Sequence, residues 1–60
     1  MIWVTDALNN GKVALNKQHI VAVFVLQDGE NEGKTAINMV NGSIIVSETD
    51  VEVVGLLQGN

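Results

Sequence analysis

Seven consecutive apolar residues, Ile20–Leu26, lie in the middle of a chain of only 60 residues. Five of the seven are β-branched or aromatic, so the run is typical of a β-strand. Because successive side chains of a strand point to opposite faces, a strand that is apolar at every position needs cover on both faces. A chain this short can hardly supply both covers. We therefore expect a β-rich protein that assembles with copies of itself or with a partner.

The length and the cysteine count favour the same conclusion. We expect residues 1–60 to form a single domain, and a domain of this size buries only about 60% of the surface that its unfolded chain exposes. Small domains are usually reinforced by disulfides, a metal or oligomerisation. The chain has no cysteine and one histidine, so it can form neither a disulfide nor a thiolate metal site. We predict a homo-oligomer without a bound metal or cofactor.

The charge of the chain excludes several classes of partner. Seven carboxylates stand against three lysines and no arginine, for a net charge of −4. Binding to nucleic acids or to anionic membrane surfaces needs cations, so neither is expected. The longest apolar run is far shorter than the roughly 18 residues of a membrane span, and the first residues lack the charged segment of a signal peptide. We predict a soluble, cytoplasmic protein.

Turn residues divide the chain into short extended segments. Asn9-Asn10-Gly11 provides turn chemistry, and Asn41-Gly42 is the signal of a type I′ hairpin, which needs positive φ at both residues. Residues 27–33 contain three acids and two glycines and should form a solvated, mobile loop. We predict strands at about residues 2–5, 12–16, 20–27, 34–40 and 43–47.

The last segment changes to a helical period. Ser47 can cap the backbone N–H of Asp50. Val51, Val54 and Leu57 recur at helical spacing, and Val53 and Leu56 widen this apolar stripe. We predict a helix over about residues 48–58, which is too short to be stable alone and must dock on one face of the sheet. The predicted fold is a β-rich α+β fold, with an antiparallel sheet of four to five short strands and one C-terminal helix. The face of the central strand that the helix leaves open is the expected subunit interface. The predicted interface residues are Val21, Val23, Phe24 and Val25.

No pattern in the chain indicates catalysis. A catalytic site normally has a nucleophile beside a base, paired carboxylates or a metal cluster, and nothing in the sequence pairs with the single histidine, His19. We predict that the chain is not an enzyme. A bound anion would need lysines that converge across an oligomer, and the lone tryptophan either packs in a core or interface or stacks on a bound ring. The candidate ligand-binding residues are Trp3, Lys12, Lys17, His19 and Lys34.

Several short motifs follow one another along nearly the whole chain. They are Met1-Ile2-x-Val4-Thr5, Gly11-Lys12-x-x-x-Asn16, Ile20, Thr35-x-Ile37-x-Met39-x-Asn41-Gly42 and Val46-x-Glu48. This order resembles the FlbD/SwrD-like family of small bacterial proteins associated with flagellar and swarming motility. The resemblance implies a non-catalytic accessory role in motility, in which the chain binds another protein.

The first turn, Asp6–Asn10, and the long central hairpin depart from the pattern of that family. These departures keep a second function open. In that alternative, the chain is an oligomeric binder of a small anion or nucleotide, for instance one encoded by a phage, with its sites between subunits.

Overall fold

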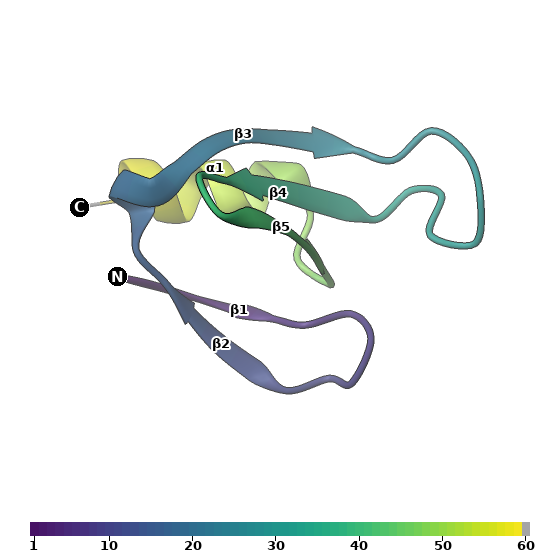
Figure 1. The fold of residues 1–60 in the computed structure, drawn as a ribbon, viewed down its shortest axis with the longest axis horizontal. Helices are drawn as coiled ribbons and strands as arrows, with labels where there is room; N and C mark the ends of the chain where they lie inside the picture. The colour runs from purple at the N-terminus through teal and green to yellow at the C-terminus, as the bar shows by residue number, and fades with distance from the viewer. Residues whose placement is uncertain (60) are drawn as a thin grey trace.

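A computed structural model describes residues 1–59 of the chain. These residues form five strands, a short 3-10 helix and one α-helix, so the predicted α+β fold with a C-terminal helix is confirmed (Figure 1). The strands are β1 (Ile2–Thr5), β2 (Lys12–Leu15), β3 (Ile20–Val25), β4 (Thr35–Met39) and β5 (Gly42–Val46). The helices are η1 (Lys17–His19), between β2 and β3, and α1 (Asp50–Gln58).

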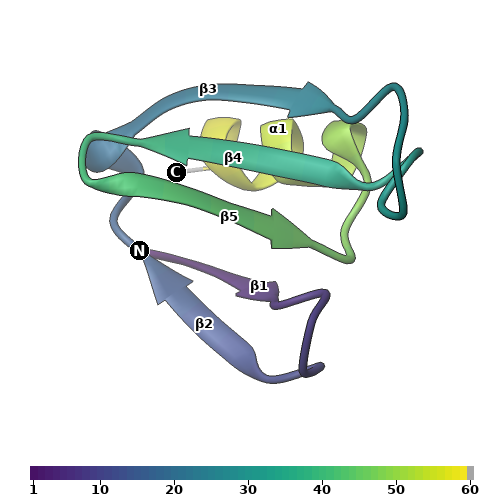
Figure 2. The ribbon, with the colours of Figure 1, turned by 45° about the vertical axis from the view of Figure 1, so that its right-hand side comes forward.

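The five strands are divided between two antiparallel sheets and do not form the single sheet that we expected. β1 pairs with β2, and β3, β4 and β5 form a second sheet in that order (Figure 2). One isolated bridge, Asp6 to Val46, joins the two sheets, with one backbone hydrogen bond of 2.9 Å on each side of it. The chain turns away just after Asp6 and again before α1, so the ladder between β1 and β5 cannot continue.

The core lies between the three-stranded sheet, the β1–β2 hairpin and α1. The main core cluster is formed by Ile2, Val4, Leu15, Ile37, Val46 and Val53. Along β4, Thr35 and Ile37 are buried and Met39 packs against the core, as expected of residues that share a face. Ala36, on the opposite face between Phe24 and Ile45, is also buried, with 4% of its surface exposed. One face of the sheet is therefore covered from within the chain, and the face that carries Phe24 and Ala36 points away from this core cluster.

The cap of α1 differs from the predicted one. The N-cap is Thr49, whose hydroxyl accepts the Glu52 N–H at 3.1 Å, while the Glu52 carboxylate accepts the Thr49 N–H at 3.1 Å. Ser47, the predicted cap, instead donates its N–H to the Thr5 carbonyl at 2.9 Å. The residue thus still belongs to the extended segment beside β1, which is why the helix starts at Asp50 and not at residue 48.

The buried side of α1 is narrower than the expected one. Val53 is fully buried and Leu57 packs against the core, whereas Val51 is 76% exposed and Val54 is 40% exposed. Val53 and Leu57 are four residues apart and therefore share one helix face. That face points into the core. Of the predicted stripe, Val53 and Leu57 therefore pack in the core, whereas Val51, Val54 and Leu56 are exposed.

The β4–β5 turn is not the predicted type I′ turn. Met39 pairs with Gly42, so the two loop residues are Val40 and Asn41. Neither has a positive φ, and Gly42, the first residue of β5, has a φ of 146°. The pairing moves the turn one residue towards β4 and brings in Val40, a β-branched residue for which a positive φ is strongly unfavourable.

Candidate functional site

A pocket of about 220 Å³ is lined by residues from three elements and by the first residue of the chain. Its lining consists of Met1, Ile2, Trp3, Lys17 and Leu56. The fold explains why β1 and η1 come together at the pocket. Ile2 pairs with Leu15 at the end of β2, so the chain that leaves β2 enters η1 close to the start of β1. The last turn of α1 supplies Leu56 from the other end of the sequence.

The pocket combines an aromatic wall with the positively charged side chain of Lys17. Ile2 and Val4 point into the core, so Trp3 between them points outwards and is 63% exposed. Lys17 is half-buried, and none of the five lining residues is acidic. An exposed indole beside an ammonium group suits a small apolar ring that carries a negative group, because the ring can stack and the ammonium can pair with the anion.

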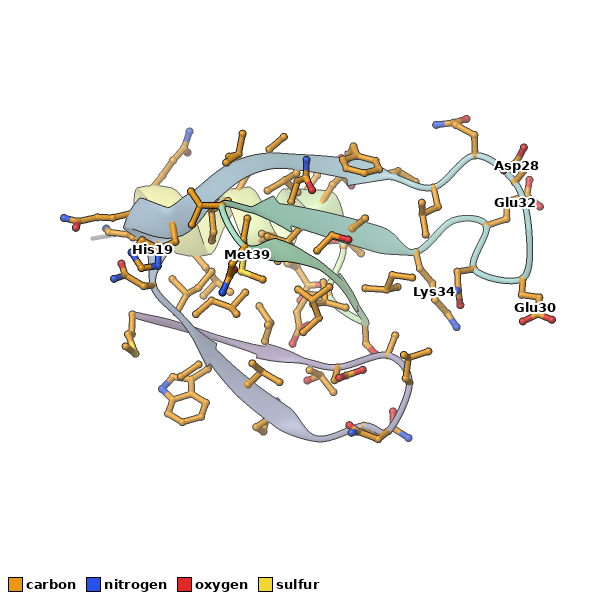
Figure 3. All side chains as sticks on the ribbon, viewed as in Figure 1. His19, Asp28, Glu30, Glu32, Lys34 and Met39 are labelled. Atoms are coloured by element: carbon orange, nitrogen blue, oxygen red, sulfur yellow. The ribbon has the colours of Figure 1, made fainter. Side chains whose placement is uncertain are left out.

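The structure brings together Trp3 and Lys17 but not the other candidate ligand residues. Lys12 lies at the opposite end of the β1–β2 hairpin, where its Nζ donates to Thr5 Oγ1 at 3.0 Å. Lys34 follows the long loop at the far end of the molecule from His19 (Figure 3). His19 ends η1 with an exposed side chain. Within one chain the lysines do not converge, and their convergence in an oligomer stays a prediction.

A carboxylate that sequence reasoning missed ties the end of β1 to the segment before α1. Glu48 Oε1 accepts the Thr5 N–H at 2.8 Å, and Glu48 Oε2 accepts the Thr5 hydroxyl at 3.0 Å. Through the Thr5 hydroxyl, Lys12 joins the same cluster. The two ends of the clamp are 43 positions apart in the sequence, so no local pattern predicts it.

The environment of Glu48 favours its charged form. Burial by itself raises the pKa of Glu48, but hydrogen bonds from the Thr5 backbone, the Glu48 backbone and the Thr5 hydroxyl, together with the charge of Lys12, lower it. The net result is a pKa below the ordinary value of 4.5. Every polar atom of this clamp has a structural partner, so we assign it to stability.

The predicted interface residues all lie on β3, which has a hydrogen-bonded neighbour on one side only. Within residues 1–59, β4 is that neighbour, and no strand pairs with the opposite edge. Val21 is 65% exposed and Phe24 is 45% exposed. Val23 and Val25 are half-buried, and Val23 packs against the core. The strand is thus partly covered on its inner face, Ala22 and Phe24 on its outer face are exposed, and no strand within residues 1–59 pairs with its second edge.

The described residues contain no group of three or more histidine, cysteine or acidic side chains that could hold a metal ion. Asp28, Glu30 and Glu32 alternate along the loop between β3 and β4 (Figure 3). No helix within residues 1–59 has the length and apolarity that crossing a membrane requires.

The chain matches no family model, no curated protein and no solved structure.

Proposed function

We propose that the chain is a non-catalytic protein-interaction module that works as a homo-oligomer, in the kind of accessory role that its resemblance to the FlbD/SwrD-like family implies. The observation that supports this proposal is the apolar composition and the unpaired edge of β3. Its six residues, IVAVFV, include no charged or polar side chain, and one edge of the strand has no partner within the described residues.

The two outer strands of the fold differ in how they are protected. Open strand edges pair with other chains unless they are short, charged or interrupted by proline. β2 has four residues and begins with Lys12, so it carries two of these protections. β3 is longer and has neither a charge nor a proline. An assembled protein would cover this edge, which is why we place the interaction surface there.

The test is the mass of the protein in solution. Light scattering after size exclusion, and native mass spectrometry from low micromolar concentration upwards, should give an oligomer. Phe24→Lys should shift the mass towards the monomer, because a lysine on the strand would be buried in the interface. The matched control is Val40→Lys, which places the same charge on an equally apolar residue, 68% exposed, in the β4–β5 turn. A monomer at every concentration would contradict the proposal.

A second candidate function, the binding of a small anionic ligand, is supported by the pocket that contains Trp3 and Lys17. Since Trp3 is the only tryptophan, its fluorescence reports on the pocket alone. Titration with an aromatic carboxylate and with a nucleotide should quench or shift this fluorescence. Lys17→Gln should weaken the response, and Lys34→Gln, a control outside the pocket, should not. An unchanged spectrum with both probes would count against this candidate.

A further inference from the structure

The second edge of β3 has a defined set of backbone hydrogen-bonding groups that β4 does not use. Leu26 donates its N–H to the Lys34 carbonyl at 2.9 Å, and its own carbonyl accepts the Gly33 N–H at 2.9 Å. Both groups of Leu26 therefore point towards the β4 side. Along an antiparallel strand this direction alternates from residue to residue. Val23 and Val25 accordingly direct their N–H and carbonyl groups to the open edge, where the Val25 carbonyl accepts Gln27 Nε2 at 3.3 Å.

We infer that the edge of β3 pairs with the same edge of a second copy, antiparallel and about a two-fold axis at Phe24. This inference rests on the proposed homo-oligomer and specifies its interface. The pairing would join the two three-stranded sheets into one continuous six-stranded sheet. The same patch on each copy forms the interface, as a two-fold dimer requires.

The position of the axis follows from the regular part of the strand. In an antiparallel ladder, two directly opposed residues are either both hydrogen-bonded across the ladder or both not. An axis between two neighbouring residues would oppose a residue whose groups point to the open edge with one whose groups point to β4. The axis must therefore pass through a residue and its own copy. The pairing of β3 is shifted between Ile20 and Ala22 and is regular from there onwards. The regular stretch 22–26 has Phe24 at its centre. An axis at Phe24 places Val23 opposite Val25 of the second copy, so the backbone groups of the two edges meet, and the Val23 N–H of one copy takes the place of the Gln27 amide at the Val25 carbonyl of the other.

The side chains fit this register. Phe24 would lie opposite Phe24 of the second copy in a pair that is not hydrogen-bonded, the closer of the two kinds, with Cα atoms about 4.5 Å apart. Aromatic pairs across strands are favourable, and the contact would cover a ring that is 45% exposed in the single chain. On the inner face, Val23 and Val25 would extend the apolar core across the seam.

The charges at the two ends of β3 favour the antiparallel direction. Lys17 and His19 precede the strand, and the loop with Asp28, Glu30 and Glu32 follows it, so the acids and His19 lie at opposite ends (Figure 3). Antiparallel pairing brings the acidic loop of one copy beside η1 of the other. Parallel pairing would place the two acidic loops together, where like charges repel. Electrostatic complementarity therefore selects the direction.

Disulfide formation tests this register, because the chain has no cysteine of its own. In Phe24→Cys the two thiols would face each other at a Cα separation that a disulfide can span. Under mild oxidation this variant should form a covalent dimer at least about tenfold faster than a control thiol elsewhere, since pairing raises the effective thiol concentration. Suitable controls are Val21→Cys on the same strand and Val40→Cys in the β4–β5 turn, both more exposed than Phe24. Intact mass without reductant measures the product.

A second pair of variants protects the test against a folding defect at Phe24. Ala22 and Leu26 oppose each other across the axis, so an equal mixture of Ala22→Cys and Leu26→Cys should give mainly the mixed disulfide. If the protein is an oligomer but neither Phe24→Cys nor this mixture links faster than the controls, the register is wrong while the oligomer stands. If the protein is a monomer at every concentration, both the register and the proposed oligomer are wrong.

Discussion

Glu48→Ala removes the carboxylate that links β1 to the segment before α1. In the structure this carboxylate accepts the Thr5 N–H at 2.8 Å and the Thr5 hydroxyl at 3.0 Å. A hydrogen bond to a charged group contributes about 1.5–3 kcal/mol, and a neutral one about 1 kcal/mol. Thr5 and Glu48 are both half-buried, so water can replace part of what is lost. We therefore expect the free energy of unfolding to fall by about 1–2 kcal/mol in total.

The corresponding change in melting temperature is large for a protein of this size. A loss of about 1 kcal/mol lowers Tm by about 4–8 °C in a small domain, so Glu48→Ala should lower it by about 4–16 °C. Thermal unfolding followed by circular dichroism measures this difference. Protein concentration must be equal in all samples, because assembly makes Tm depend on concentration.

The matched control is Glu30→Ala, which removes the same charge from the exposed loop between β3 and β4. This control should change the free energy of unfolding by less than about 0.5 kcal/mol, as surface substitutions usually do. Equal melting temperatures for Glu48→Ala and Glu30→Ala would refute the reasoning. The clamp would then contribute nothing beyond its charge.

Two further predictions concern the same region. Because the folded pKa of Glu48 lies below 4.5, its contribution to stability is complete above that pH and is lost as pH falls through the folded pKa; Glu48→Gln should flatten this part of the stability profile, and an unchanged slope in acid titration would contradict the assignment. Thr49→Ala should cost about 1 kcal/mol through loss of the helix cap, whereas Ser47→Ala should cost less than about 0.5 kcal/mol. Urea unfolding that gives equal losses for these two variants would show that the cap lies elsewhere.

The sequence predicts the individual elements well because their signals are local. Asn10, in the predicted turn Asn9-Asn10-Gly11, has a positive φ of 62°, and β1 spans the predicted residues 2–5. The alternation along β4 correctly assigns Thr35 and Ile37 to the core face. In each case the prediction depends only on residues that are close together in the sequence.

The N-cap of α1 could have been predicted correctly from the sequence. Ser47-Glu48-Thr49-Asp50 and Thr49-Asp50-Val51-Glu52 both begin with a capping residue. Only the second has the glutamate at the third helical position that a reciprocal capping box uses. The structure forms that second box. A glutamate three residues after Thr49, compared with an aspartate three residues after Ser47, is therefore the sequence signal that identifies the N-cap.

The division into two sheets and the partner of Glu48 could not be predicted in this way. Both depend on where β1 meets the end of β5, an encounter of residues about 40 positions apart. Hydrophobic alternation specifies which face of a strand is buried, but it does not say how many pairs form between two strands. That number is limited by the turn that follows Asp6 and the bend that follows Val46, and hence by the tertiary arrangement.

The pocket and the open edge of β3 meet at η1, and this connects the two candidate functions. Lys17 lines the pocket and also belongs to the short helix that leads into β3. In the inferred dimer the acidic loop of the second copy would lie beside η1, and a carboxylate of that loop that paired with Lys17 would compete with a bound anion for its ammonium group. Two ligands that compete for one group weaken each other by the same factor. An anion in the pocket would therefore loosen the dimer, and dimer formation would weaken anion binding equally.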